Sequence, residues 1–279
     1  LFVLWAMYPD ECARQPGGLI LVTPTGEFFL AITFLVLAIC TAVFTLLGFK
    51  HSKDKRSFFW ITGFVTLIAS LAYFSMLGGQ GWVISPNCRQ VFFTRYIDVA
   101  ITTSLILIDL ALISGADADL MWSVVGFDLL MVFCGWMASV SMGNVKWMWF
   151  LFSLATFTPV LYCVLRPFRE SADLHHVSVS ELYAKVSWLT VITWCLYPLV
   201  WIMGTGTNVM SPNFEIMLVA VLDIIAKGVF GFVLLLSHEA LDRSTNIYGY
   251  KHLSEPSDNP PEPEYRTIQR PGSSTVVMT

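Results

Sequence analysis

Seven stretches of this chain are each long and apolar enough to cross a lipid bilayer. A membrane-spanning helix needs about 20 mainly apolar residues. With 56% hydrophobic and 13% charged residues, the chain carries too much apolar surface for a water-soluble core. The sequence therefore predicts an all-α bundle of seven transmembrane helices. The predicted spans are residues 27–49, 58–79, 91–114, 119–141, 145–165, 181–204 and 213–238.

The distribution of lysine and arginine predicts how the bundle is oriented. Short loops rich in these residues stay in the cytoplasm. Segments 50–56 and 166–185 carry four and three of them, whereas the alternate side carries Arg14, Arg89 and Lys146. The N-terminus is therefore expected outside and the C-terminus in the cytoplasm, with the plasma membrane as the expected location.

This orientation divides the chain into three parts. Residues 1–26 form an extracellular segment and residues 27–240 the membrane domain. Residues 241–279 form a cytoplasmic tail that is expected to be disordered because it is poor in hydrophobic residues. Cys12 and Cys88 both lie on the outer, oxidising side, where we hypothesise that they form a disulfide.

Charge and cysteine spacing argue against two classes of partner. The net charge of -4 argues against a nucleic-acid partner. The six cysteines form no Cys-x-x-Cys pair and no His/Cys cluster, so no metal site is predicted. The chain begins at Leu1 rather than at methionine, which is expected of a fragment or a processed form.

A lysine lies in the middle of the last apolar run. An ionised amine at mid-membrane costs several kcal/mol, so Lys227 is expected to be paired, neutralised or covalently used. Asp223 lies four residues earlier, on the same face of the helix.

The third span carries an arginine and two carboxylates on one face. Arg95 and Asp98 are three residues apart, and Thr102 follows Asp98 by four. Asp109 follows Asp98 by eleven, close to a whole number of turns and about 16 Å along the axis. We expect Asp109 to be protonated in its apolar setting and Asp98, near Arg95, to stay ionised, which would make an acid and a base. Any one of these groups alone could be a structural contact, but the aligned set is typical of an ion or proton path.

The sixth span carries an aromatic stripe. Trp194, Tyr197 and Trp201 recur at three and four residues, a spacing that alone favours helix packing. Pro198 is expected to kink the helix, and beside Lys227 the stripe predicts a pocket for a flat, apolar molecule bound to the amine.

Four motifs together resemble those of the microbial (type 1) rhodopsins, and among them the fungal branch of the bacteriorhodopsin-like proton pumps. The resemblance covers roughly residues 27–240. The motifs are Arg95-Tyr96-Ile97-Asp98 with Thr102-Thr103, Leu107-Ile108-Asp109-Leu110, Trp194-x-x-Tyr197-Pro198-x-x-Trp201, and Leu222-Asp223-x-x-Ala226-Lys227.

The resemblance implies a light-driven outward proton pump rather than an enzyme. Lys227 would bear all-trans retinal as a protonated Schiff base, with Asp98 and Asp223 as counterions. Asp98 would be the proton acceptor, and Asp109 would return a proton from the cytoplasmic side.

Further residues match supporting positions of the family. Thr62 would hold Asp109, Thr102 would hydrogen-bond Asp98, and Arg95 would relay the proton outward. Asp128 matches an aspartate near the retinal ring. The pocket positions are Tyr96, Val99, Thr103, Ile106, Met131, Gly135, Ser153, Trp194, Tyr197, Pro198, Trp201 and Ala226.

The chain departs from the family pattern at three places. Val99 stands where a tryptophan wall is usual, which leaves a void that Phe93 or another aromatic would fill, or a repacked pocket. Ser104 replaces a proline. Glu215 matches one of two outer glutamates, but residues 204–207 offer no second carboxylate, so proton release is expected late in the cycle.

Two alternatives to pumping remain. A photosensor or slow-cycling auxiliary rhodopsin fits Val99 and the missing glutamate, and its tail would dock a cytoplasmic partner. Asp109 favours pumping, because sensors often lack the donor. A retinal-free chaperone or transporter is disfavoured by Lys227. Whether the protein forms a homo-oligomer is left open.

Overall fold

The computed structural model describes residue 12 and residues 18–50, 56–237, 267–270 and 273–276. Within these ranges, seven helical segments are long and apolar enough to cross a membrane. The predicted all-α bundle of seven spans is present, and the chain is an integral, multi-pass membrane protein.

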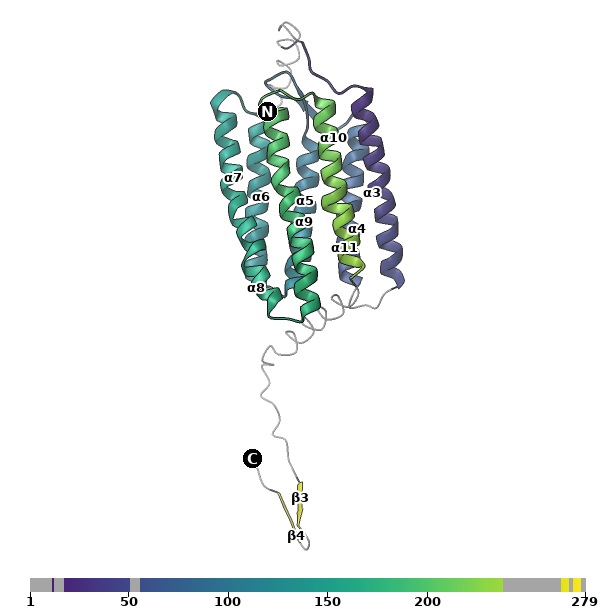
Figure 1. The fold of residues 1–279 in the computed structure, drawn as a ribbon, viewed down its shortest axis with the longest axis vertical. Helices are drawn as coiled ribbons and strands as arrows, with labels where there is room; N and C mark the ends of the chain where they lie inside the picture. The colour runs from purple at the N-terminus through teal and green to yellow at the C-terminus, as the bar shows by residue number, and fades with distance from the viewer. Residues whose placement is uncertain (1–11, 13–17, 51–55, 238–266, 271–272, 277–279) are drawn as a thin grey trace.

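The spans stand side by side as a single bundle (Figure 1). Helices adjacent in sequence pack against each other because short loops join them. The spanning helices are α3 (Pro24–Lys50), α4 (Arg56–Leu77), α5 (Phe93–Ser114), α6 (Ala118–Val140), α7 (Gly143–Leu165), α9 (Val177–Trp201), and α10 (Pro212–Asp223) followed by α11 (Phe230–Leu235).

Two π-helical segments interrupt the last two spans. One, Ile202–Gly206, follows α9, which runs as an α-helix through Pro198. The other, Ile224–Val229, joins α10 to α11 and contains Lys227. Such wide turns occur often at functional sites, and sequence patterns gave no sign of either.

A short hairpin precedes α5 at one end of the bundle, here called the hairpin end. Strand β1 (Trp82–Ile84) pairs antiparallel with β2 (Gln90–Phe92). The third span was predicted to begin at residue 91, which was two residues too early because Val91 and Phe92 complete the hairpin.

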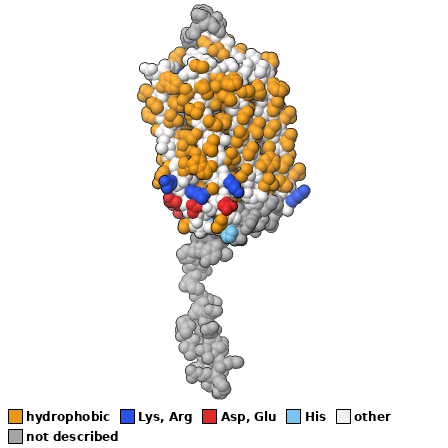
Figure 2. All heavy atoms as spheres, in the orientation of Figure 1, with side chains coloured by type: hydrophobic (Ala, Val, Ile, Leu, Met, Phe, Trp, Pro, Cys, Tyr) orange, Lys and Arg blue, Asp and Glu red, His pale blue; other side chains and the backbone are white. Residues whose placement is uncertain are grey.

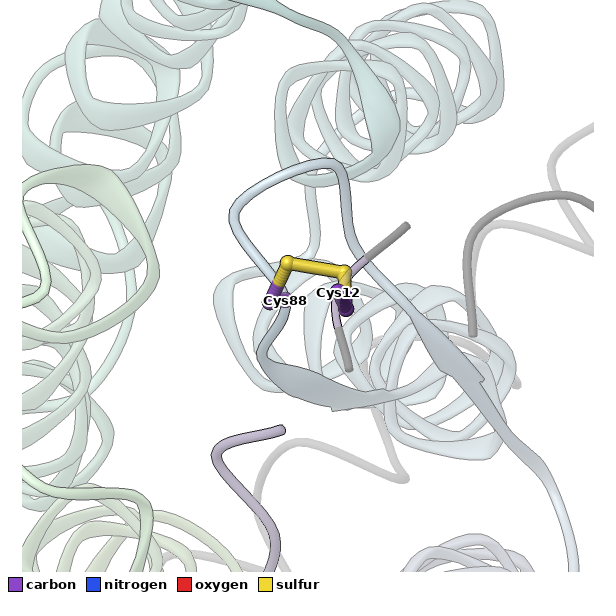
Figure 3. The surroundings of a disulfide bond; sticks show 2 residues. All are labelled: Cys12 and Cys88. Atoms are coloured by element: carbon purple, nitrogen blue, oxygen red, sulfur yellow. A yellow bond between two sulfur atoms is a disulfide. The ribbon is translucent and has the colours of Figure 1, made fainter. Parts of the chain in front are cut away.

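The hairpin loop is covalently joined to the N-terminal segment. Cys12 and Cys88 form the predicted disulfide (Figure 3). Near it, the main chain of Ile20 donates to Cys88 O at 2.8 Å and accepts from Gln90 N at 3.0 Å. The segment before α3 is therefore fastened over the hairpin end.

The opposite end carries α8 (Pro167–Asp173), directly after α7 (Figure 1); it is called the α8 end. Hydrophobic side chains cover the visible flank of the bundle between the two ends, and charged side chains gather toward the α8 end (Figure 2). This is the surface expected of a chain whose flank faces lipid.

The predicted tail is described only at two short strands, β3 (Thr267–Arg270) and β4 (Ser273–Val276), which pair with each other. The rest of residues 241–279 lies outside the described residues, as do most of residues 1–26 and residues 51–55 of the basic loop. The predicted disorder of the tail stays a prediction.

Candidate functional site

The lysine of the last span forms two ion pairs in the middle of the bundle. Lys227 is 2% exposed, and its Nζ lies 2.5 Å from Asp98 Oδ2 on α5 and 3.6 Å from Asp223 Oδ1. The pair with Asp223 follows from their spacing of four residues. The contact with Asp98 joins two spans that lie far apart in the sequence.

Two phenols hold Asp223 in place. Tyr73 on α4 donates to Asp223 Oδ2 at 2.7 Å, and Tyr197 on α9 donates to Oδ1 at 2.5 Å. These donors stabilise the ionised carboxylate inside the bundle. Tyr73 is 1% exposed and was not among the predicted site residues; its signal was that a buried tyrosine usually finds a partner for its hydroxyl.

The hydroxyl of Thr102 forms the hydrogen bond to Asp98 that the resemblance implied. It donates to the main-chain oxygen of Asp98 at 2.8 Å, because a helical threonine readily bonds the carbonyl four residues earlier. Asp98 Oδ1 is buried and has no hydrogen-bond partner among the described residues.

Asp109 lies apart from the charged groups, nearer the α8 end of α5. Its side chain is fully buried, and Oδ2 accepts a hydrogen bond from Thr62 Oγ1 at 3.1 Å. None of the ion pairs found in the described part of the chain includes it. The predicted contact between Thr62 and Asp109 is therefore present.

A cavity of about 170 Å³ reaches Lys227 from the side of α6, α7 and α9. All the predicted pocket positions line it. Its lining also includes six apolar residues that sequence reasoning missed, because nothing distinguishes them from ordinary packing residues. They are Val132, Phe150, Leu154, Phe157, Val200 and Val219.

Aromatic rings build one end of this cavity. Trp201 stacks on Phe150 with ring centroids 4.6 Å apart and planes 6° apart. Ser139 on α6 fixes two rings at once: its hydroxyl lies 2.7 Å from Trp201 Nε1 and 2.5 Å from the Tyr96 hydroxyl. The aromatic stripe of α9 is thus a cavity wall, and Ser139 is a missed residue that orients it.

Phe93 does not take the place of the tryptophan that is usual at position 99. Val99 itself lines the cavity. Phe93 does not line it; that ring is 36% exposed and meets Trp136 edge-on at 6.4 Å. The suggestion that Phe93 fills this place was wrong, because its position at the start of α5 turns it outward.

Ser104 supplies a second donor to a buried carboxylate. Asp128 Oδ2 accepts from Thr103 Oγ1 at 2.7 Å and from Ser104 Oγ at 3.2 Å. A proline at residue 104 has no side-chain donor, so this departure from the family pattern ties α5 to α6.

A second ion-pair group lies at the hairpin end. Glu215 Oε2 accepts from Arg89 Nη2 at 2.6 Å, and Glu215 Oε1 lies 3.9 Å from Arg95 Nη1. Within 4 Å, Arg95 therefore pairs with Glu215 rather than with Asp98. A cavity of about 20 Å³, lined by Arg95, Tyr96 and Glu215 among others, lies here and has room for about one water.

Two cations that were counted as loop residues prove to be buried. Arg89 is 1% and Lys146 5% exposed. Lys146 Nζ donates to the main-chain oxygens of Gly206 at 3.0 Å and Thr205 at 3.4 Å. It thereby satisfies carbonyls at the end of the π-helical segment, where a cation is favourable.

Comparison with known proteins identifies the family. Residues 24–241 match the profile of one protein family, described as bacteriorhodopsin-like protein. This chain belongs to that family. Members of the bacteriorhodopsin-like family are retinal proteins.

Individual relatives agree with this assignment. Opsin-1 of Neurospora crassa is 32% identical over 242 residues, which cover 80% of this chain and 79% of that protein. Archaerhodopsin-3 of Halorubrum sodomense is 34% identical over 255 residues, 89% of this chain and 96% of that protein. The crystal structure of a light-driven proton pump from Leptosphaeria maculans matches 79% of this chain and 99% of its own length, with a TM-score of 0.75 and 31% identity.

Proposed function

We propose that this bacteriorhodopsin-like protein is a light-driven outward proton pump with all-trans retinal on Lys227, the acceptor Asp98 and the donor Asp109. The observation that carries the proposal is the placement of two carboxylates on one helix. Asp98 contacts Lys227 Nζ at 2.5 Å, whereas Asp109 lies eleven residues further along α5 and, among the described residues, is hydrogen-bonded only to Thr62.

The cavity fits retinal in its chemistry. Its walls are mainly apolar and aromatic, and it reaches a buried primary amine. Asp98 and Asp223 beside that amine stabilise a positive charge on Nζ. Retinal attached there as a Schiff base would absorb the light and change shape, which supplies the energy for proton movement at Nζ.

Asp98 is placed to accept the proton that leaves Nζ. A proton acceptor must lie within hydrogen-bond distance of the proton it takes, and Asp98 Oδ2 meets this condition. Asp223 has the longer distance of 3.6 Å, and its oxygens already accept from Tyr73 and Tyr197. We assign Asp223 to the role of a permanent counterion.

Asp109 is placed to return a proton from the opposite side. A carboxyl group buried without a charged partner favours its neutral, protonated form. Asp109 would therefore hold a proton that it can donate later in the cycle. Thr62 on α4 donates a hydrogen bond to Asp109 Oδ2 and so anchors this carboxyl group of α5 to α4. About 16 Å along α5 separates it from Asp98.

The direction follows from the proposed orientation of the bundle. The disulfide lies at the hairpin end, and disulfides persist in oxidising compartments. Basic residues favour the cytoplasm at the α8 end. The hairpin end is therefore outside, so a proton that moves from Asp109 through Nζ to Asp98 moves outward, toward Arg95 and Glu215.

The deciding experiment expresses the protein with all-trans retinal and illuminates cells in unbuffered medium. Outside acidification that an uncoupler abolishes supports the pump. The absence of any visible absorbance band would overturn retinal binding. Medium that becomes alkaline under illumination would overturn the outward direction.

A photosensory or slow-cycling rhodopsin is the second candidate. Val99 favours it, because a small aliphatic side chain lines the cavity where the family usually has a tryptophan. A visible band without uncoupler-sensitive acidification of the medium would select this candidate over the pump.

A further inference from the structure

Arg89 is buried at the hairpin end, although it follows a loop cysteine, and two of its three guanidinium nitrogens have hydrogen-bond partners. Its Nη2 donates to Glu215 Oε2 at 2.6 Å, and its Nη1 donates to Met210 O at 2.7 Å. The guanidinium thus joins the hairpin to the start of α10 and to the loop before it.

Among the described residues, the Glu215 carboxylate is hydrogen-bonded to an arginine and to a hydroxyl group. Arg89 donates to Oε2, and Thr205 donates to Oε1 at 3.1 Å. Arg95 is a further cation, 3.9 Å from Oε1. The Thr205 hydroxyl could bond either form of the carboxyl group, but a guanidinium can only donate, and two nearby guanidinium cations favour an ionised carboxylate. The arrangement therefore suits the ionised form.

The other titratable groups of this end do not alter that balance. Lys146 on α7 donates to the carbonyls of Thr205 and Gly206 rather than to Glu215. The hydroxyl of Tyr96 lies against Ser139. In the described part of the chain, the ion pairs of this end join one carboxylate, Glu215, to two guanidinium groups, those of Arg89 and Arg95.

The position of Arg89 is fixed by its surroundings. It follows Cys88, which is bonded to Cys12, and the main chain of Ile20 bonds the residues on both sides of it. The main chain at Gly204 also lies close to this carboxylate: a Cβ added to Gly204 would come within 2.5 Å of Glu215 Cδ and Oε2. Glu215 therefore contacts both Arg89 and the glycine main chain at residue 204.

We infer that Arg89 is a positioning residue that keeps Glu215 ionised at rest, so that Glu215 stores no proton for early release. This inference rests on the proposed pump function. The proton that leaves the protein is then the one that Asp98 accepted from Lys227 Nζ. It departs only when Asp98 gives it up past Arg95, after a proton has been taken up at the α8 end.

The test compares Arg89→Gln with Arg89→Lys and the double variant Arg89→Gln/Glu215→Gln. The first readout is the infrared spectrum in the dark, without light or turnover. Arg89→Gln should show an additional C=O stretch of a protonated carboxylic acid, beyond that of the protonated Asp109 common to all variants, and the wild type, Arg89→Lys and the double variant should lack this additional band.

The second readout is the order of proton release and uptake, followed with a pH-indicator dye after a single flash. Wild type and Arg89→Lys should take up a proton first. Arg89→Gln should release first, and the double variant should return to the wild-type order. Loss of the visible band would mark a variant that has not folded around retinal.

Three results would overturn the inference. The first is a folded Arg89→Gln whose dark infrared spectrum and order of proton release and uptake are those of the wild type. The second is a C=O stretch of protonated Glu215 in the wild type. The third is a Glu215→Gln single variant that reverses the wild-type order of release and uptake. The single variant keeps the test decisive if Arg89→Gln does not fold. Absence of all light-driven proton movement in the wild type would reject the pump, while the dark spectra would still decide the role of Arg89.

Discussion

Lys227 Nζ lies 2.5 Å from Asp98 Oδ2, although 129 residues separate the two along the chain. This contact joins the last span to the third at mid-bundle. Asp223, 3.6 Å from the same nitrogen, adds a second negative charge. Removal of one partner from a buried ion pair costs about 3–5 kcal/mol, so the three residues are expected to respond strongly to substitution.

Lys227→Ala should abolish stable retinal attachment, because it removes the only atom in the cavity lining that we expect to form the imine. The measurement is the visible absorbance band after addition of all-trans retinal to purified protein. Lys146→Ala is the matched control; it removes another buried lysine that does not line the cavity and should keep the band. A visible band in Lys227→Ala would contradict the assignment.

Asp98→Asn should stop light-driven acidification while retinal still binds. It should also shift the absorbance band to longer wavelength, because loss of the negative charge beside Nζ weakens the localisation of positive charge there. Asp98→Glu keeps the charge and should retain a band near that of the wild type. Acidification at the wild-type rate by a folded Asp98→Asn would remove Asp98 from the acceptor role.

Asp109→Asn should slow the recovery of the resting state by about 100-fold, since a positioned acid typically contributes this much or more. Recovery should also become slower as the pH rises, because the proton must then come from the solvent. Flash photolysis across a pH series measures both effects. Thr62→Val, which keeps the carboxyl group but removes its hydrogen bond, should give a smaller effect, and equal effects from both would point to a packing role.

Cys12→Ser/Cys88→Ser should lower the melting temperature of the protein. The bond closes a loop whose ends are 76 residues apart, and closure of a loop this long is worth about 4 kcal/mol in the chain-entropy model. Differential scanning calorimetry of the wild type, with and without reductant, against the double variant measures the loss. Cys134→Ser, a buried free cysteine on α6, controls for loss of a thiol. Peptide mapping that finds both thiols free in the wild type would refute the bond.

Residue spacing predicted much of the site because helices impose a local geometry. The pair Asp223 and Lys227, and the shared face of Asp98 and Asp109, follow from the helical period. The resemblance then supplied the pocket positions, all of which line the cavity. The hydrogen bond from Thr102 to Asp98 is also present, but that it goes to the main-chain oxygen is a choice of acceptor that only local side-chain geometry decides.

The sequence by itself determined the number of spans, because the thickness of a bilayer demands about 20 apolar residues for each, and it marked Lys227 as a group that needs a partner. The tertiary structure alone decided which distant groups meet. Ser139 contacts both Tyr96 and Trp201, Tyr73 reaches Asp223, and Arg89 reaches Glu215 across 126 residues. Such contacts depend on how the helices and the fastened hairpin come together, and no periodicity within a single helix encodes them.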